Sequence, residues 1–264
     1  LDQPDYVQFA VFVKNAVKGE FGLSLKQGRL VSTLIKERLP ATLELALVAG
    51  GLALLGGLLM GVYTALRRDS WLSQFLLTVS LIGVSLPNFL IGILLILIFA
   101  VTLQWLPSYG RGDVTAIGWW TTGFLTTGGL RALVLPAVTL SLYPMTLIMR
   151  LVRSEMLEVL RTDYIKFARA RGLTNRAVHF GHALKNTLVP VMTITGLQLG
   201  SIIAFAIVTE TVFQWPGMGF LFIQSVQFAD IPVMAAYLVL ISFVFVSINL
   251  IVDLSYSAID PRIR

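Results

Sequence analysis

Few side chains in this sequence could carry out chemistry. Its two histidines, His179 and His182, are three positions apart, which places them about 300° apart around a helix and therefore close to each other. Neither a carboxylate nor a third ligand accompanies them, so we interpret them as solvated loop residues and not as a metal site. The absence of cysteine excludes disulfides, a thiol nucleophile and Cys-based metal sites. We therefore expect no metal and no other cofactor.

Three carboxylates, Glu44, Glu210 and Asp253, lie near the ends of long apolar runs. An ionisable residue inside a membrane span is a functional candidate by default. We interpret Glu44 as structural, because it lies about one turn after the start of its run, where a helix N-terminus favours negative charge. Asp253 lies one turn from Asn249 and is interpreted as an interfacial helix-end residue.

Nucleotide and enzymatic sites are not indicated. Gly217-Met218-Gly219 lacks the lysine and the strand context of a phosphate-binding loop, and no GxxxxGK[ST] motif occurs. An intramembrane enzyme would need a Ser–His pair, paired Asp residues or a metal set within its spans, and both histidines lie outside them. We therefore expect that this chain is not itself an enzyme.

The composition indicates an all-α integral membrane protein. Of 264 residues, 56% are hydrophobic and 13% charged, and the mean hydropathy is +0.82, whereas soluble domains carry about 25% charged residues. About twenty apolar residues suffice to cross a bilayer. Five such spans are predicted, at residues 41–66, 71–106, 131–149, 187–208 and 231–258.

The second span is too long for one straight crossing, and Pro87 predicts one kinked, tilted helix; two short spans are the alternative. Residues 1–39, with Tyr6, Phe9 and Phe12 at helical spacing, are predicted to be an external amphipathic segment. Pro40 then opens the transmembrane domain, residues 40–264. The glycines of the first span give it a small face that allows close helix packing.

The most charged stretch after the first forty residues is 153–190. Tyr164, Phe167 and Ala168 form the predicted apolar stripe of a helix that runs to Arg171. Gly172 is predicted to end that helix in a left-handed conformation. Thr174 is the predicted N-cap of a second helix.

Three interpretations of this basic helix–turn–helix compete. It could be a positive loop that only fixes topology, a nucleic-acid-binding element, or a docking element for a cytoplasmic partner. Because both ends are anchored in lipid, we expect no nucleic acid and favour docking.

The motifs of this stretch resemble a known family. Ala168-Arg169-Ala170-Arg171-Gly172, followed after ten residues by Ala183-Leu184-Lys185-Asn186 and Val189-Pro190, is similar to the EAA loop of ABC importer permeases. The resemblance continues through 19–25, 38–47, 209–219 and 259–264. Lys166 and Lys185 stand where the general motif has Glu and Pro, as is usual in the dipeptide, oligopeptide and nickel permease subfamily.

The resemblance implies a type I ABC importer permease fold, with five of the family's six transmembrane helices in this chain. The family has a first helix ahead of the region that resembles Leu1–Pro4, and we expect this chain to lack it. Residues 153–187 would be the cytoplasmic coupling loop. The residues implied to dock the ATPase subunit are Tyr164, Phe167, Ala168, Arg169, Ala170, Arg171, Gly172 and Leu173.

Residues 211–230 are too apolar for an exposed loop and too short to span. We predict a re-entrant segment that lies against protein, because its irregular backbone cannot face lipid. Trp215 supplies a large apolar body and one N–H that needs a partner. The predicted outer gate consists of Phe213, Trp215, Pro216 and Gly217; a segment that only packs the external side is the alternative.

Charge predicts the topology. Segments 67–69, 150–186 and 262–264 carry Arg and Lys and are predicted to be cytoplasmic, whereas the nearly neutral loops at 107–130 and 210–230 are external. The C-terminus is therefore predicted to be cytoplasmic. The family resemblance implies that the membrane is a bacterial inner membrane.

The resemblance implies a permease subunit that forms half of an importer's pathway for peptides or similar small solutes. The implied partners are membrane lipid, a second homologous permease subunit, cytoplasmic ATP-binding subunits that hydrolyse ATP, and an external solute-binding protein. An ion-coupled secondary transporter is the alternative. Such a transporter needs ionisable residues near the midplane, and the carboxylates of this chain lie near span ends.

Overall fold

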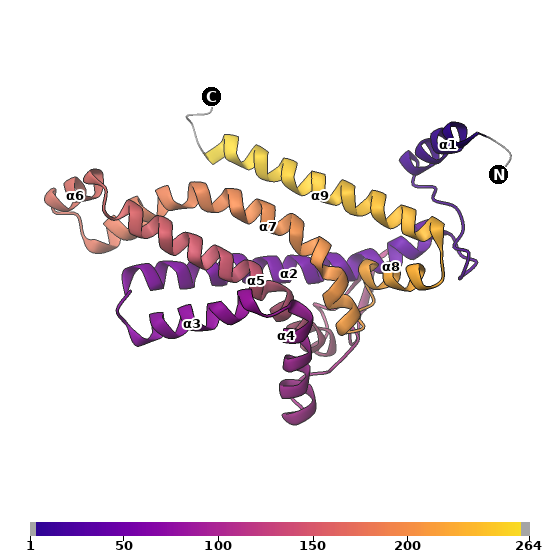
Figure 1. Ribbon diagram of the computed structural model, residues 1–264, viewed down its shortest axis with the longest axis horizontal. Helices are drawn as coiled ribbons and strands as arrows, with labels where there is room; N and C mark the ends of the chain where they lie inside the picture. Colours follow the sequence, from indigo (N-terminus) through magenta and orange to yellow (C-terminus); the bar gives the residue numbers. More distant parts are fainter. Residues whose placement is uncertain (1–3, 260–264) are drawn as a thin grey trace. The chain divides into compact units, whose positions relative to one another are not determined.

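The computed structural model describes residues 4–259 of the chain, without the side chains at positions 5, 189, 193, 197, 199, 252, 253 and 255–259. The segment 260–264, the side chain of Asp253 and most of the motif at 259–264 therefore lie outside the described part. The predicted all-α class is confirmed (Figure 1). The helices are α1 (Asp5–Val17), α2 (Val31–Leu66), α3 (Trp71–Ser85), α4 (Asn88–Leu95), η1 (Ile96–Thr102), α5 (Thr127–Val159), α6 (Asp163–Ala170), η2 (Ala177–Ala183), α7 (Leu184–Val212), α8 (Met218–Gln227) and α9 (Ile231–Ile259).

The chain forms two compact units, each of which draws on three parts of the sequence. Unit 1 comprises Leu1–Leu45, Gly92–Pro136 and Ile203–Val244, and unit 2 comprises Ala46–Ile91, Ala137–Ile202 and Phe245–Arg264. The gate candidates at 213–217 belong to unit 1, and the coupling loop belongs to unit 2.

Three of the described helices are long and apolar enough to cross a membrane, namely α2, α5 and residues 231–251 of α9. Two further pairs reach that length only when both halves of a bent helix are counted, at 71–102 and 190–212. With both pairs included, the structure has the five spans that the sequence predicts.

The first span begins earlier than predicted. Val31, not Pro40, opens α2, and Pro40 lies inside the helix. Val31, Leu34 and Ile35 are buried in the core of unit 1 together with residues of α8 and α9. This burial stabilises helical turns ahead of the proline, so residues 1–39 do not form one separate external element. The predicted helix near the N-terminus is present as α1.

The prediction of one kinked helix over 71–106 is wrong. The axes of α3 and the segment 88–102 differ by 114°, and α4 turns away from α3 in Figure 1. Leu86, which precedes Pro87, has an extended backbone with φ −94° and ψ 136°. A proline disfavours the helical region for the residue before it, so the helix stops instead of bending gently.

The external loop contains an unpredicted hairpin. Strands β1 (Thr115–Ile117) and β2 (Trp120–Thr122) pair antiparallel with Ile117 opposite Trp120. Gly118 takes a φ of +62° at the first position of the two-residue turn, where a type II′ turn requires glycine.

In unit 2, α2 and α5 pack closely through glycines, as predicted. A Cβ added to Gly57 would lie 2.8 Å from the side chain of Ile148, and one added to Gly61 would lie 2.6 Å from Val152. Helix α5 itself continues to Val159 and does not end at Arg150. The first residues of the predicted coupling loop, 153–159, are therefore part of this helix.

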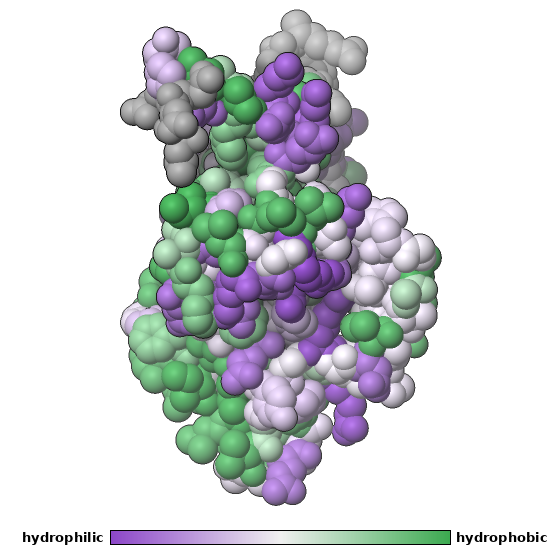
Figure 2. Space-filling view, turned by 90° about the vertical axis from the view of Figure 1, so that its right-hand side faces the viewer, coloured by the Kyte–Doolittle hydropathy of each residue, from purple (hydrophilic) through white to green (hydrophobic). Residues whose placement is uncertain are grey.

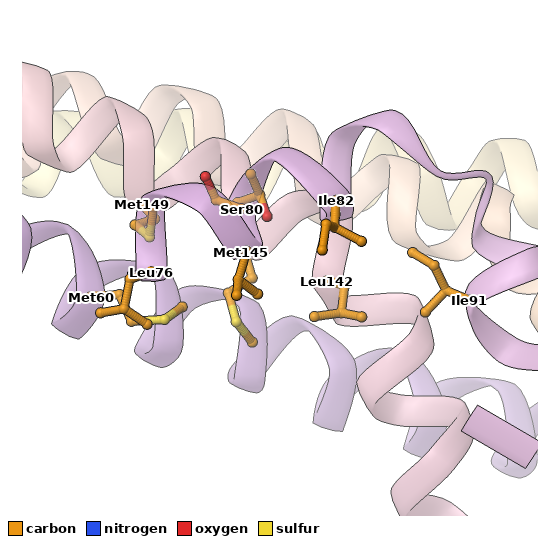
Figure 3. Close-up of a pocket in the computed structure, with 11 residues that line it drawn as sticks. Met60, Leu76, Ser80, Ile82, Ile91, Leu142, Met145 and Met149 are labelled. Carbon is orange, nitrogen blue, oxygen red and sulfur yellow. The ribbon is translucent and has the colours of Figure 1, made fainter. Parts of the chain in front are cut away.

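A cavity of about 160 Å³ in unit 2 is lined mostly by apolar side chains of α2, α3 and α5 (Figure 3). Its sulfur-containing residues Met60, Met145 and Met149 come from α2 and α5. The hydroxyl of Ser80 in its wall already donates to the carbonyl of Leu77, at 2.7 Å.

The surface in Figure 2 shows hydrophilic residues across the middle and hydrophobic residues gathered toward the lower left.

Candidate docking loop and Trp-Pro-Gly segment

The turn after α6 confirms the predicted role of Gly172. Its φ is +79°, its N–H donates to the carbonyl of Arg169 at 2.9 Å, and the N–H of Leu173 donates to the carbonyl of Ala168 at 3.3 Å. These two bonds form a Schellman motif, in which the left-handed residue follows the C-cap. An added Cβ at Gly172 would meet nothing within 4 Å. The backbone conformation, not lack of space, therefore favours glycine here.

The predicted apolar stripe of α6 is wrong in part. Ile165 and Ala168 are buried in the core of unit 2, next to Met156 of α5. By contrast, Phe167 is 64% exposed and Tyr164 is 41% exposed. A two-turn helix has room for a narrow contact face, and the i, i+3 pair Ile165 and Ala168 occupies it.

The second helix of the loop is continuous with the following span. Thr174 Oγ1 accepts from the N–H of Ala177 at 3.3 Å, which confirms the predicted N-cap. The helix resumes at position 175, passes through the π-helical segment η2 and continues without a break into α7. The predicted span from 187 therefore has no separate beginning. Single π-helical turns are often found at functional sites.

A hydrogen-bond cluster ties α6 to this second helix. The hydroxyl of Tyr164 donates to the carbonyl of His182 at 3.3 Å and accepts from Asn186 Nδ2 at 2.6 Å. Asn186 Nδ2 also donates to the His182 carbonyl at 3.2 Å. Tyr164 thus holds α6 in a defined position, although its ring is partly exposed.

The outer surface of the loop combines apolar and cationic side chains. The exposed docking candidates are Tyr164, Phe167, Arg169, Ala170, Arg171, Gly172 and Leu173. The guanidinium of Arg171 lies 5.8 Å from the ring centre of Phe167. Partial burial, and then the charge of Arg169, lower the pKa of His179.

The Trp-Pro-Gly segment is buried in unit 1. Phe213 and Trp215 are each 1% exposed, Pro216 is half-buried and Gly217 is buried. The Trp215 indole N–H donates to the carbonyl of Ala41 in α2, at 2.9 Å. The predicted need for a partner of this N–H is therefore met. The predicted re-entrant loop includes a helix, α8, which follows Gly217 directly.

The buried carboxylate of Glu210 holds this segment in place through hydrogen bonds. It accepts from Thr42 Oγ1 at 2.6 Å and from the N–H of Phe220 at 2.9 Å, so its carboxylate caps the N-terminus of α8. Thr42 Oγ1 in turn accepts from the N–H of Met218 at 2.7 Å. A Cβ at Gly217 would collide with the Glu210 carboxylate. The glycine is required because the carboxylate occupies its side-chain space.

A buried ion pair connects α2 to the hairpin loop. Arg111 Nη2 donates to Glu44 Oε2 at 2.6 Å, and Glu44 also accepts from the Trp120 indole and the Gly123 amide, each at 3.3 Å. Glu44 is structural, as predicted, but for a different reason, because α2 begins thirteen positions before it at Val31. Sequence reasoning missed Arg111, although it is the one basic residue between Arg68 and Arg131.

Sequence reasoning also missed the structural role of Asp230. It binds the turn after α1, where it accepts from the hydroxyl of Ser24 and from the Leu25 amide, the latter at 3.1 Å. Burial alone would raise the pKa of Asp230, but the hydrogen bonds from Ser24, Leu25 and Lys26 outweigh burial and lower it. Lys26 lies over the ring of Phe228, 2.9 Å from its centre.

Solved structures share this fold. One is an inward-facing MetNI methionine ABC transporter, with a TM-score of 0.66 and 20% identity over 86% of this chain and 96% of that chain. A second is an amino acid ABC transporter solved with histidines, with a TM-score of 0.59 and 11% identity over 97% of this chain and 99% of that one. The fold is therefore that of a type I ABC importer permease, a class of multi-pass membrane protein.

Sequence comparison defines the family. Residues 57–264 match the family described as binding-protein-dependent transport system inner membrane component. The chain is 37% identical to the dipeptide transport system permease protein DppB of Alkalihalophilus pseudofirmus, covering all of this chain and 83% of that protein. It is 41% identical to the di/tripeptide transport system permease protein DppB of Pseudomonas aeruginosa, covering all of this chain and 82% of that protein. The chain belongs to the binding-protein-dependent transport system inner membrane component family.

Proposed function

We propose that the chain is one permease subunit of an ATP-driven importer of peptides or similar small solutes, and that it forms half of the pathway. The family match and the printed functions of the relatives support this assignment. The other proposed components are a second, homologous permease subunit, cytoplasmic ATP-binding subunits and an external solute-binding protein. ATP hydrolysis would belong to the ATP-binding subunits.

The single observation that carries the coupling proposal is the two-sided construction of α6. Its inner face, Ile165 and Ala168, belongs to the same buried cluster as Val62 of α2 and Val152 of α5. Its outer face presents the exposed Phe167 with neighbouring arginines. A partner that moves the outer face would therefore move these spans as well, because a packed core transmits displacement.

Replacing Phe167 tests this coupling. Phe167→Ala removes an exposed ring, so folding should be unaffected, whereas solute-stimulated ATPase activity of the assembled importer should fall by about fivefold or more. Phe180→Ala is the matched control, since Phe180 is 53% exposed on η2, outside the docking candidates. Equal effects of both variants, or unchanged stimulation in Phe167→Ala, would refute docking through α6.

Sidedness is proposed from the charge pattern, with the coupling loop and the C-terminus in the cytoplasm of a bacterium. Trp119 and position 175 are both exposed, so accessibility of the side chain does not bias a labelling test. In this cysteine-free chain, Trp119→Cys should react with an impermeant maleimide added outside, and Asn175→Cys should not. The reverse pattern would overturn the topology.

An ion-coupled transporter is less well supported. The carboxylate of Glu44 is engaged by Arg111, and that of Glu210 by Thr42 and by the start of α8. These contacts give both buried acids structural roles.

We further propose that Phe213, Trp215, Pro216 and Gly217 shape the outer gate, where the solute-binding protein would release its cargo. Their burial beside α2 supports a role that changes when α2 moves. The hydrogen bond from Trp215 to Ala41 supplies a direct link to that helix.

A further inference from the structure

A groove of about 630 Å³ in unit 2 runs between α3 and α5 and holds two arginines. The α3 wall consists of Gln74, Leu77, Thr78 and Leu81, and the α5 wall consists of Arg150, Arg153, Ser154 and Leu157. Each set repeats at i, i+3, i+4 and i+7, so each is one face of its helix. None of these eight described residues is acidic. The groove therefore carries two positive charges between leucine side chains.

The arginines lack ionic partners within the described part of the chain. No ion pair of a described carboxylate involves Arg150 or Arg153. Arg150 Nε and Nη2 both reach Ser80 Oγ, but at the long distance of 3.4 Å. Arg153 Nε is buried and has no hydrogen-bond partner among the described residues. A guanidinium has five N–H donors, so most of the donor capacity of the pair remains available to a ligand.

The groove lies where apolar spans end. Arg150 directly follows the apolar run that ends at Met149, and α3 begins at Trp71, which is 78% exposed. Tryptophan and arginine are typical of the boundary between hydrocarbon and headgroups. Phe75 and Val79 on α3 are also exposed, as expected for side chains that contact lipid.

We propose that this groove binds the phosphate of an anionic phospholipid in the leaflet that contacts the coupling loop. Arg150 and Arg153 would hold the phosphate oxygens, since planar guanidinium groups bind phosphate through two parallel hydrogen bonds. Ser154, one turn from Arg150, supplies a neutral donor, and Leu77 and Leu81 provide an apolar wall for the acyl chain.

Charge and apolar surface together favour a lipid over two other anions. A free phosphate would use the arginines but not the leucines of the groove. A carboxylate of the second permease subunit would neutralise the arginines but would also cover the exposed face of α3. Both alternatives are decided by the experiment below.

The experiment uses the assembled importer in phosphatidylcholine nanodiscs with an increasing fraction of phosphatidylglycerol. Phosphatidylglycerol that remains bound after detergent extraction is counted by native mass spectrometry. Each basic residue near an anionic membrane contributes about 1 kcal/mol, so Arg150→Gln and Arg153→Gln should each reduce retention about fivefold. The Arg150→Gln/Arg153→Gln variant should retain about 25-fold less phosphatidylglycerol. The Arg150→Lys/Arg153→Lys variant keeps the charge and should retain most of the lipid.

Arg161→Gln is the charge-matched control, because Arg161 is exposed and lies after α5, outside the groove. It should retain phosphatidylglycerol like the unaltered importer. Three results would overturn the proposal. These are full retention in the double Gln variant, displacement of the lipid by inorganic phosphate at millimolar concentration, and loss of the second permease subunit from the double variant with lipid retention per complex unchanged.

Discussion

The coupling loop exposes most of its candidate residues to the surroundings, whereas the Trp-Pro-Gly segment buries most of its own. In the loop, Phe167 and Arg171 point outward from a two-turn helix, and a left-handed glycine with free space around it ends that helix. In the segment, Phe213 and Trp215 are buried, and Gly217 is confined by the Glu210 carboxylate. Both regions depend on a glycine, but for different physical reasons.

This difference separates two kinds of mutational effect. Substitutions on the outside of the loop should change communication with a partner and leave stability intact, because surface positions contribute little to folding. Substitutions in the buried segment and its surroundings should first change stability, since they remove packing or leave polar groups without partners. The comparison fails if activity and stability change together in both regions.

The largest effect is expected at the buried pair beside the segment. Arg111→Met leaves the Glu44 carboxylate buried without its cation, which should lower the free energy of unfolding by about 3–5 kcal/mol. The double variant Glu44→Gln/Arg111→Met removes both charges and should recover much of that loss. Thermal unfolding of the purified importer measures both. A double variant no more stable than Arg111→Met would show that the pair does not act as a unit.

The next effect concerns Trp215 and distinguishes a gate from packing. Trp215→Ala should lower the amount of assembled importer, because replacing a buried tryptophan with alanine costs about 3–5 kcal/mol. Trp215→Phe keeps most of the ring volume but loses the hydrogen bond to Ala41. This loss should lower the free energy of unfolding by about 1 kcal/mol. If the segment is a gate, Trp215→Phe should change transport or basal ATPase rate per complex. Unchanged activity per complex in Trp215→Phe would leave packing as its role.

Gly172→Val tests the role of the left-handed turn in the coupling loop. Valine would have to adopt a positive φ, which costs about 1–2 kcal/mol of conformational free energy for a residue with a Cβ. It would also disturb the Schellman turn. We expect solute-stimulated ATPase activity to fall sharply while the subunit still inserts. Gly181→Val is the control, because an added Cβ at Gly181 also meets nothing within 4 Å and its φ is helical. The turn has no special role if both variants behave alike.

Local backbone signals were predictable from the sequence, and long-range polar partners were not. The glycine after an amphipathic stripe identified the turn at Gly172, and a large indole in a short apolar segment identified a buried N–H at Trp215. The pairing of Glu44 with Arg111 joins positions 67 residues apart, and no local pattern specifies it. The first turns of α2 were missed for a similar reason, since burial against α8 and α9 stabilises them.

The face of α6 shows where periodicity alone was insufficient. Tyr164, Phe167 and Ala168 recur at helical spacing, and two of them have large aromatic rings. The periodicity of the sequence therefore predicts that all three side chains are buried on one face of the helix. The structure instead buries Ile165 with Ala168. For a helix of eight residues, several stripes fit the same pattern, and the neighbouring core decides among them.

The smallest effect is expected at Asp230, which fixes the turn after α1 in unit 1. Its pKa is lower in the folded state than in the unfolded chain, so its stabilising contribution is present above the unfolded value and is lost as the pH falls through the folded value. With an unfolded pKa of about 3.9, this contribution should be complete at neutral pH and decline below about pH 4.

Asp230→Asn tests this contribution and extends the comparison to a third site. The amide cannot carry the charge that the Ser24 hydroxyl and the Leu25 amide stabilise, so the variant should unfold more easily at pH 7, by about 1 kcal/mol. The difference from the unaltered protein should shrink as the pH falls from about 4 toward the lower folded pKa of Asp230, because Asp230 is protonated first in the unfolded chain and then in the folded protein. Thermal unfolding midpoints between pH 3 and pH 7 measure this convergence. A difference independent of pH would mean that Asp230 acts through shape and hydrogen bonding alone, and not through its charge.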